Sequence, residues 1–597
     1  MKDEKGSITL FTLIAMIFLL TIAFTAYTST MIKLQSQNTE LDQIIANYSK
    51  DANAENLEKL YNEATGTRNW LQGEGTEQNP HKIYTIEDLV ELSNRTNSGE
   101  SFANQYIELM NDLDFNDVRS YEKYDRKDFG DINENGTVES LKTELTTGAG
   151  FMPIGKTNAL VLKATFDGNN HTIKHLKVDR NMNFASLIGN SYVVQNLTVK
   201  DGDVKGGTCT SGIVGALRSG KVENCHNDNT AVVLRDGSYF SVAGVVGQIS
   251  QGSIGAFNCT NSGTITGIGG NKGDGTSYLQ IGGVAGRNNG IVNNCSNTGE
   301  VIGIGGYHIG GVVGSSSNNI TNCTNSGTVR GEKLNVGGVS GYVNSNSTVS
   351  NCRNTGEIIG SDEMVGGIVG RTDQNVTITG CSNTGAVTGA ERTGGVTGNG
   401  STSSIVTSCS NTGAVTGTSS TGGVVGILFG TVEQCYNTGT VTQNAGKGDF
   451  GGVVGQIGTN CVAKIQNCYN TGKLIEQASN INGVGGVIGW VSDTGTTGQI
   501  NNNYSIGEID IQGSNVTNVG GAIGRFNTSA ITMSNNYYEL GKSNVTLNSL
   551  GEGREQANMK TTAFINLLNT NQNPTVWQSD TTSINNGYPI LKWQINH

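Results

Sequence analysis

Eight cysteines in the middle of the chain each begin the same short element, Cys-x-Asn-Thr/Ser-Gly. Cysteine thiolates bind zinc or form disulfides, so these residues are the first candidates for chemistry. Zinc binding needs cysteines and histidines that converge within a short span, and the chain contains no Cys-x-x-Cys pair. We therefore predict no metal at these cysteines. The copies begin at Cys259, Cys295, Cys323, Cys352, Cys381, Cys409, Cys435 and Cys468, and Cys225 starts a degenerate ninth copy.

The regular recurrence of these cysteines has a structural explanation. If the copies stack, equivalent positions lie above one another, and the cysteines form a column of small buried residues. Their parallel Cβ directions disfavour disulfides, which prefer a torsion angle of about 90°. We predict free, buried thiols. Cys209 and Cys461 fall outside the column and are the candidates for a disulfide or another role.

An asparagine stands two residues after each of these cysteines. Asparagine tolerates the left-handed conformation before a glycine, and stacked amides can hydrogen-bond from one copy to the next. We therefore predict a column of asparagines along the repeat, with that left-handed turn at each of them. A row of amides that binds a ligand is the alternative. The residues are Asn261, Asn297, Asn325, Asn354, Asn383, Asn411, Asn437 and Asn470.

Carboxylates that could cleave a polysaccharide are few within the repeat. Asp362, Glu363 and Asp373 fall in one stretch with Arg371, and this group is the best candidate for a lyase or hydrolase site. Such enzymes need carboxylates that converge on one groove. Charged side chains in solvated turns have the same pattern in a sequence. We predict no catalytic residue and expect that the chain is not an enzyme.

A polar run before the repeat resembles a calcium-binding loop. Asp131, Asn133 and Asn135 place oxygen atoms at alternate positions, and Gly136 follows them. The twelfth position of such a loop supplies a bidentate carboxylate, and here it is Lys142. A turn held by Asx hydrogen bonds is the alternative. The prediction is therefore no metal and no cofactor.

These candidate residues are positioned by a repeat that runs from Gly212 to Gly541, within a domain predicted over residues 201–545. Between Gly286 and Gly455 the units are 27–29 residues long. A fixed period of this length is typical of a solenoid, in which each unit buries its apolar face against its neighbours. The first block of each unit ends at Gly215, Gly247, Gly286, Gly314, Gly341, Gly370, Gly398, Gly426, Gly455, Gly489 or Gly524.

Each unit is predicted to form three short strands joined by tight turns. Examples are the valine-rich block 337–341, the stretch 320–323 that leads into cysteine, and the stretch 327–331 between two glycines. No proline occurs between Pro153 and Pro574, as expected where nearly every backbone N–H is needed for a sheet. We predict an all-β fold, a single-stranded parallel β-helix or β-solenoid.

A candidate membrane span precedes the repeat. Residues 1–30 contain an uncharged, mostly apolar run from Ser7 to Tyr27, and about twenty residues are enough to cross a bilayer as a helix. Apolar residues at three- and four-residue steps predict a helical stalk and a linker over residues 31–80. We predict a signal-anchor in the cell membrane that leaves the bulk of the chain outside the cell.

The start of the chain also resembles a type IV prepilin. The sequence Lys-Gly-Ser-Ile-Thr-Leu at residues 5–10 is similar to the beginning of prepilin-like proteins, whose leader is cut after the glycine. The resemblance implies a mature N-terminus at Ser7. Such pilins carry glutamate five residues after the cut, and this chain has Phe11 there. An uncut membrane anchor is the alternative.

Atypical segments flank the repeat, because a solenoid must cover its exposed end coils. Residues 81–200 contain a helix with a capping-box pattern at Thr85 and Asp88, and then the first coils with a polar insertion. Residues 546–597 contain a short helix and an aromatic closing segment. We predict small α/β caps at both ends, the second of which covers the last coil.

The Gly-Gly-Val-Val-Gly blocks, as at residues 310–314, and the Cys-x-Asn-Thr-Gly elements together resemble the GLUG repeat of bacterial surface proteins. The resemblance covers about residues 200–541 and implies a right-handed parallel β-helix on an exported protein with adhesive or matrix-associated roles. GLUG repeats also lie beside the catalytic region of immunoglobulin A peptidases, but their zinc motif His-Glu-x-x-His is absent here. The histidines are scattered: His81, His171, His175, His226, His308 and His597.

Composition narrows the class of partner. The net charge is −12 and no basic stripe is present, which disfavours nucleic acid. This composition and the resemblance to GLUG proteins together predict a membrane-anchored cell-surface rod with a structural or adhesive role. We expect it to bind a glycan or a protein through faces rich in Thr, Ser and Asn. A carbohydrate-active β-helix enzyme and a minor pilin-like subunit are the alternatives.

Overall fold

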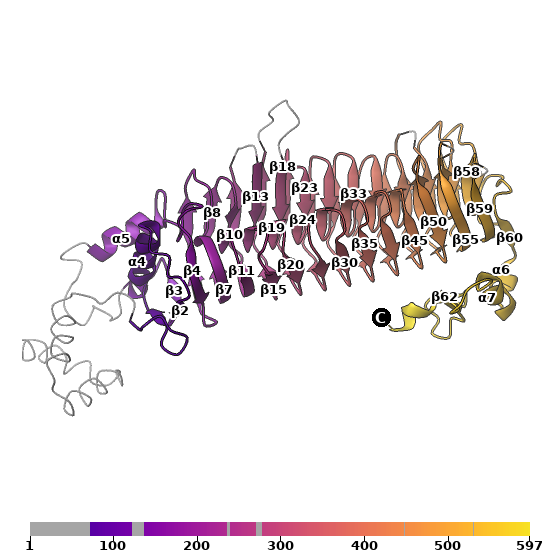
Figure 1. Ribbon diagram of the computed structural model, residues 1–597. Helices are drawn as coiled ribbons and strands as arrows, with labels where there is room; N and C mark the ends of the chain where they lie inside the picture. The colour runs from indigo at the N-terminus through magenta and orange to yellow at the C-terminus, as the bar shows by residue number, and fades with distance from the viewer. Residues whose placement is uncertain are drawn as a thin grey trace, which may run out of the picture.

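A long parallel β-solenoid forms most of the molecule (Figure 1). The computed structural model describes residues 72–121, 137–235, 239–269, 278–446, 448–492, 494–528 and 530–596. Within these residues one sheet along the rod joins 12 strands and another joins 11. The predicted all-β, parallel solenoid is therefore confirmed, and its handedness stays a prediction.

One coil shows how the repeat folds. Its strands are β24 (Val313–Ser316), β25 (Ile320–Thr321), β26 (Thr324–Asn325), β27 (Val329–Gly331) and β28 (Asn335–Gly337). β29 (Ser340–Val343) opens the next coil and lies on β24, with Ser340 opposite Val313. Each of these strands pairs with the strand five places on, so the coil has five strands and not the three predicted.

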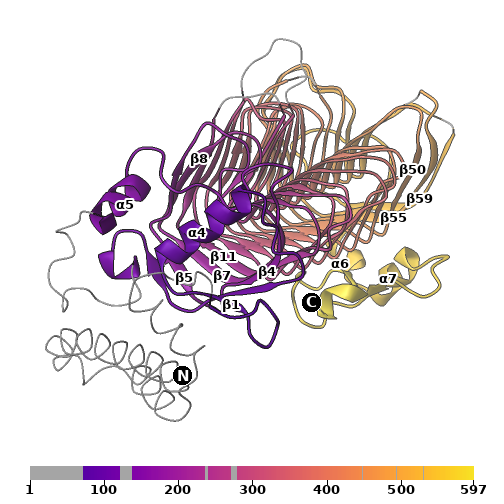
Figure 2. The same cartoon turned by 60° about the vertical axis from the view of Figure 1, so that its left-hand side comes forward.

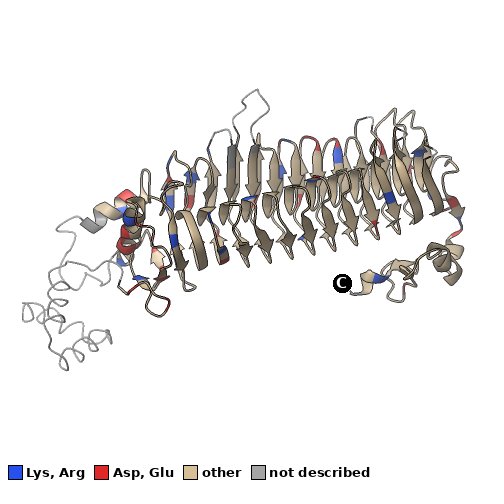
Figure 3. Ribbon diagram, in the orientation of Figure 1, with Lys and Arg blue, Asp and Glu red and all other residues tan. Residues whose placement is uncertain are grey.

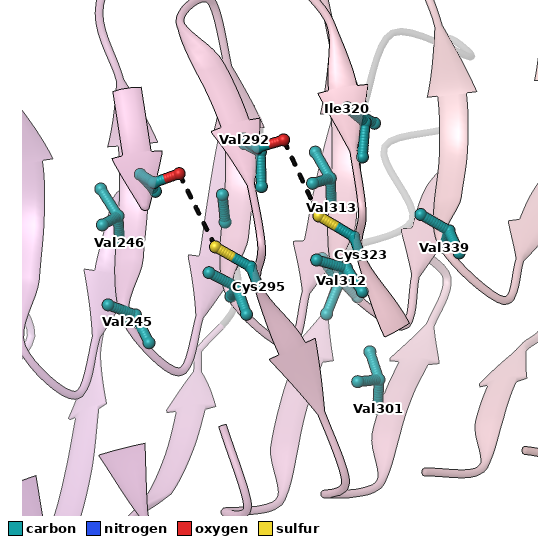
Figure 4. Packing of buried hydrophobic residues seen from close by; sticks show 14 of the residues in the cluster. Val245, Val246, Val292, Cys295, Val301, Val312, Val313, Ile320, Cys323 and Val339 are labelled. Atoms are coloured by element: carbon teal, nitrogen blue, oxygen red, sulfur yellow. Dashed lines mark hydrogen bonds between the residues drawn. The ribbon is translucent and has the colours of Figure 1, made fainter. Parts of the chain in front are cut away.

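The prediction of one strand for each valine-rich block is wrong because the chain turns inside the block. Val312 and Val313 are both fully buried, whereas successive side chains of a strand point to opposite faces (Figure 4). A corner between β23 (His308–Gly310) and β24 lets both side chains enter the core. An added Cβ on Gly311 would lie 2.2 Å from the carbonyl oxygen of Gly338. Only glycine therefore fits this corner.

Helix α4 (Ile86–Asn97) covers the first coil, as predicted (Figure 2). Its capping box is confirmed: the Thr85 hydroxyl accepts a hydrogen bond from the backbone N–H of Asp88 at 3.2 Å, and the Asp88 carboxylate accepts one from the N–H of Thr85 at 3.0 Å. Leu89 and Leu92 are fully buried on the inner face of the helix. The helix thus shields one end of the core from solvent.

The first coils are built by β1 (His81–Ile83), β2 (Tyr106–Leu109), β4 (Leu162–Asp167) and β7 (Ile188–Lys200), each parallel to the next. The proposed calcium ligands Asp131, Asn133 and Asn135 lie outside the described residues. Lys142 lies in α5 (Thr137–Thr146), which follows them.

The far end of the solenoid is closed by residues 540–551 and not by the predicted helix. Asn544 Nδ2 donates to the carbonyl of Ile511 at 2.9 Å, and Asn544 Oδ1 accepts from the Ile511 N–H at 2.9 Å. Asn548 Nδ2 donates to the carbonyl of Ile523 at 3.1 Å. These side-chain amides bond to backbone groups where residues 540–551 cover the last coil, whereas no described strand pairs with the outer edge of residues 531–536.

The helix and aromatic segment predicted to cover the last coil lie along the side of the rod instead. After β60 (Glu552–Arg554) the chain forms α6 (Gln556–Met559) and α7 (Thr562–Leu568) and turns back along the coils (Figures 1 and 2). Near its end, Trp593 Nε1 donates to the carbonyl of Gln434 at 2.9 Å. We call residues 556–596 the C-terminal strap.

The predicted membrane span and most of the stalk cannot be placed in this fold. Residues 1–71, including the prepilin-like segment, lie outside the described residues and stay predictions. In the part of the chain that the structure describes, no helix is both long enough and apolar enough to cross a membrane.

Candidate functional site

The predicted cysteine column is confirmed. All eleven cysteines are free, and those of the column are at most 1 % exposed. Cys323 Sγ lies 3.2 Å from the carbonyl oxygen of Thr321 and 3.7 Å from that of Val292 in the preceding coil (Figure 4). Burial raises the pKa of Cys409 and Cys435 well above the ordinary thiol value. The thiolate that metal binding and nucleophilic attack require is therefore disfavoured at these two cysteines.

The two cysteines outside the column are also buried and free. Cys209 Sγ donates to Gln248 Oε1 at 3.3 Å and accepts from Ser241 Oγ at 3.4 Å, and Cys461 Sγ donates to the carbonyl of Gly458 at 3.4 Å. Burial raises the pKa of both thiols. Neither residue forms a disulfide.

The predicted asparagine column is confirmed as a continuous hydrogen-bonded ladder. Asn325 Nδ2 donates to Asn354 Oδ1 at 2.8 Å, and Asn354 Nδ2 donates to Asn383 Oδ1 at 2.8 Å. The ladder residues are at most 1 % exposed, so the alternative of a ligand-binding row is wrong. The ladder runs through Asn227, Asn261, Asn297, Asn325, Asn354, Asn383, Asn411, Asn437 and Asn470.

The left-handed residue of each copy is the one before the cysteine, and the prediction that placed it at the ladder asparagine is wrong. Asn322 has a φ of 54° and Asn351 a φ of 53°, whereas the ladder residues Asn325 and Asn354 keep negative φ. The chain bends between β25 and β26, and this bend lets the next side chain, Cys323, point into the core. Left-handed backbone is needed at the bend and not in the strand that follows it.

The carboxylates considered for catalysis do not converge. Glu363 forms an ion pair with Arg392 at 3.2 Å, and the half-exposed Asp362 lies beside it in the same turn. Asp373 lies beyond the next corner and accepts a hydrogen bond from Ser345 Oγ at 2.9 Å. The structure therefore places Glu363 and Asp373 with different partners and assembles no acid–base pair from this stretch.

Arg371 belongs to a separate cluster that sequence reasoning missed. Its guanidinium lies 5.5 Å from the ring centre of Tyr342, and that ring stacks on His308 at 4.8 Å. Asn335 Nδ2 lies 2.8 Å from His308 Nδ1. Burial, and then the charge of Arg371, lower the pKa of His308 to about 4. The imidazole is therefore neutral at pH 7 and joins neighbouring coils as a packing group.

No metal centre can be built from the side chains that the structure describes: no group of three or more His, Cys, Asp or Glu residues converges there. The described histidines are scattered, as predicted. His171 pairs with Asp112 at 3.1 Å, and His175 pairs with Asp114 at 2.7 Å.

Two acids are buried near the C-terminal end of the solenoid. Glu476 is 0 % exposed, and burial raises its pKa to about 8. Asp449 is 7 % exposed, and burial raises its pKa to about 7. Gln443 lies in register with Glu476 on the preceding coil, and Gln443 Oε1 and Glu476 Oε2 both lack a hydrogen-bond partner. A protonated Glu476 could therefore donate to Gln443.

Replacing Glu476 with glutamine should flatten the pH dependence of stability. Because the folded pKa of about 8 lies above the unfolded value of about 4.5, the folded chain holds a proton that the unfolded chain releases. Stability should fall as pH rises through this window, by up to about 1.4 kcal/mol per pH unit, and Glu476→Gln should remove this term. Thermal melting between about pH 5 and about pH 9 measures it.

The exposed Glu391→Gln is the matched control and should keep the wild-type profile. Asp449, whose pKa is also raised, should leave a slope of the same sign in Glu476→Gln, whereas His308, whose pKa is lowered, acts in the opposite direction below about pH 6.5. Superimposable pH profiles for wild type and Glu476→Gln would show that Glu476 is not held neutral in the fold.

One outer side of the rod, formed by β25, β26 and their equivalents, carries short polar side chains in straight rows. We call it the lateral face. Successive coils place these residues in register, so each row has a spacing of about 4.8 Å. Few charges interrupt the rod, whereas charged residues gather at the N-terminal end (Figure 3). The rows are Asn293, Thr321, Ser350, Thr379 and Thr407, and Ser296, Thr324, Arg353, Ser382 and Ser410.

Toward the C-terminus tyrosines continue the second row of the lateral face, and the C-terminal strap packs on them. The rings of Tyr469 and Tyr504 stack at 5.2 Å, and the ring of Trp577 lies 5.4 Å from Tyr504. Part of the signal was present in the sequence, because Tyr436 and Tyr469 follow the cysteine where Ser, Thr or Arg stands in the earlier copies, whereas Tyr504 and Tyr537 follow asparagine. The row is Tyr436, Tyr469, Tyr504 and Tyr537.

Fold and site together define a repeat protein of the parallel β-solenoid class. The family model of the GLUG motif matches residues 305–330, about one coil, which confirms the predicted repeat over that stretch. Halomucin of Haloquadratum walsbyi (strain DSM 16790 / HBSQ001) is 27% identical over 187 residues, which are 31% of this chain and 2% of halomucin. This chain thus spans a very small part of that relative.

Among solved structures, the crystal structure of a candidate immunoglobulin A1 protease from Bacteroides ovatus aligns with the chain. The alignment covers 87% of this chain and 94% of the other, with 16% sequence identity and a TM-score of 0.21. At this TM-score the likeness supports no conclusion about fold or activity.

Proposed function

We propose that the chain is a rigid cell-surface rod that binds glycans along its lateral face. The observation that carries this proposal is the pair of straight rows of Ser, Thr and Asn on that face, in which Arg353 is the one charged residue. Hydroxyl and amide groups match the hydroxyl groups of a glycan, and equal spacing lets one extended polymer make the same contact on many coils. Many weak contacts then add up to useful affinity.

The buried ladders support this function because they make the rod stiff. Coils joined by strand pairing and by the amide bonds between ladder residues, such as Asn325 and Asn354, cannot slide past one another. Outward side chains are therefore held in fixed rows before a ligand arrives, which lowers the entropy cost of binding.

Binding of the full-length chain to immobilised polysaccharides tests the proposal. Neutral polymers should bind with similar affinity at about 0.1 M and about 1 M salt, because the rows carry little charge. Thr379→Glu on the lateral face should weaken binding, whereas Thr388→Glu, on another face of the same coil, should not. No binding to any polysaccharide, binding to proteins alone, or equal loss in both variants would refute it.

Attachment of the rod to the cell is a separate part of this proposal. We propose that residues 1–30 anchor the chain in the membrane with the solenoid outside. The mature N-terminus tests the prepilin-like alternative: mass spectrometry should find Met1 for an uncut anchor and Ser7 for prepilin processing. Recovery of the chain from the soluble fraction of lysed cells would contradict both.

A further inference from the structure

Unequal turn lengths in adjacent coils create a small depression at the border of the lateral face, lined by residues of four coils. The turn at residues 429–430 is two residues long, whereas the turns at 401–404 and 458–461 in the neighbouring coils are longer. A short turn between two longer ones leaves a notch of about 230 Å³. Its lining residues are Thr402, Ser403, Phe429, Asn460, Cys461, Val462, Gly495 and Thr497.

The depression has apolar surface that the fold leaves uncovered. Val462 is 73 % exposed, and Ile405, on the adjoining strand, is 39 % exposed. The half-buried ring of Phe429 lies over Gly458, where an added Cβ would be 2.1 Å from the ring. The glycine therefore fixes the place of the ring.

The walls of the depression are held in place by the backbone. Asn460 has a φ of 53°, and Gly495 has a φ of 62°. A Cβ on Gly495 would lie 2.2 Å from Asn460 Oδ1, so the two turns pack closely. Thr496 Oγ1 also donates to the carbonyl of Gly458 at 2.9 Å. The shape is thus formed before any ligand binds.

The chemistry of the lining favours a neutral, polyhydroxylated ring. Apart from the apolar surface it offers the hydroxyls of Thr402, Ser403 and Thr497 and the amide of Asn460, and no Lys, Arg, Asp, Glu or His. A charged ligand would lose water here without gaining a partner. The volume is below the 300–1,000 Å³, roughly, of pockets for drug-sized ligands, which suits one ring.

We propose that this depression binds a single neutral sugar ring, the end or a branch of a glycan that lies on the lateral face. The apolar C–H face of the ring packs on Phe429 and Val462, and its hydroxyls bond to the Thr, Ser and Asn side chains. Burial keeps the neighbouring Cys461 thiol protonated, so no thiolate takes part. This inference rests on the proposed glycan-binding function and assigns it a subsite.

Saturation-transfer NMR on the full-length chain with neutral methyl glycosides of glucose, galactose and mannose tests the subsite. At least one glycoside should receive saturation, and Phe429→Ala should weaken its binding by about tenfold or more. Val462→Glu gives a second test without a folding risk, because Val462 is 73 % exposed. Phe257→Ala, another half-buried ring on the lateral face, is the control and should bind the glycoside normally.

The outcomes separate this inference from the proposed function. If polysaccharide binds the wild type but neither Phe429→Ala nor Val462→Glu changes glycoside binding, the subsite is wrong and the rod function stands. Binding of an apolar peptide or a charged sugar in place of the neutral glycosides would also overturn the subsite. If no polysaccharide binds the wild-type chain, both proposals fail. If the variants melt at the same temperature as the wild type, any loss of glycoside binding arises at the depression and not from unfolding.

Discussion

Replacing Asn354 with leucine is expected to lower the free energy of unfolding by about 3–5 kcal/mol. Asn354 makes three buried hydrogen bonds, of 2.8, 2.8 and 2.9 Å, to Asn325, Asn383 and the carbonyl of Gly356. Leucine has a similar size but offers no donor or acceptor, so each partner loses a bond where water cannot replace it. Thermal or urea unfolding followed by circular dichroism measures the loss.

The neighbouring Arg353→Ala is the matched control for this substitution. Arg353 is exposed on the same strand, so its loss should change stability by less than about 0.5 kcal/mol. Hydrogen exchange should place the damage of Asn354→Leu in the coils next to it, because each coil of a solenoid contacts only its neighbours. Equal stability of the two variants would show that the ladder contributes little.

Replacing Trp577 with alanine is expected to release the C-terminal strap from the rod. Trp577 is 1 % exposed, and its Nε1 donates to Asn467 Oδ1 at 3.1 Å. Truncation of a buried Trp lowers the stabilising free energy by about 3–5 kcal/mol. This loss is a large part of the free energy that a short segment gains by docking. Limited proteolysis with mass spectrometry should then find new cuts within residues 556–596.

The strap prediction also has an internal control. Ile595→Ala changes a residue of the strap that is 47 % exposed and should leave the strap protected. The coils at the N-terminal end of the rod should keep their hydrogen-exchange protection in Trp577→Ala, because the strap lies at the opposite end (Figure 1). Loss of protection throughout the rod, or a strap that stays resistant to protease, would contradict this assignment.

Much of the fold was predictable because equivalent positions in stacked coils have the same surroundings. Each such position therefore favours the same residue type in every repeat. A cysteine and an asparagine at fixed places in each unit imply columns, and the structure confirms both as buried. The capping box at Thr85 and Asp88 could also be predicted, since it depends on four consecutive residues only.

Other features depend on geometry that a repeat pattern does not contain. The corner between Val312 and Val313 follows only from the burial of both side chains, and it divides one predicted strand into two. The fifth strand of the coil, β26, lies outside the three predicted strands. The side-docked strap requires the tyrosine row to be matched with aromatic residues such as Trp577, far along the sequence. The depression at Phe429 arises from differences between adjacent turns, which become visible only when the coils are stacked.

The arrangement of the candidate enzyme residues also could not be predicted from the repeat pattern. Asp362, Glu363, Asp373 and Arg371 are near one another in the sequence, but a corner of the solenoid separates Glu363 from Asp373. Nearness in sequence is therefore a poor guide in a coil of five short strands. Residues about one repeat apart, such as Thr379 and Thr407, are the true neighbours.

The fate of a polysaccharide that the full-length chain binds distinguishes a binding rod from an enzyme. The bound polymer should be recovered with unchanged chain length and no new reducing or unsaturated ends after prolonged incubation, because a binding rod holds its ligand without cleaving it. Shortened polymer whose formation is abolished by Asp373→Asn would show that the chain is an enzyme, and it would contradict the proposed role as a binding rod.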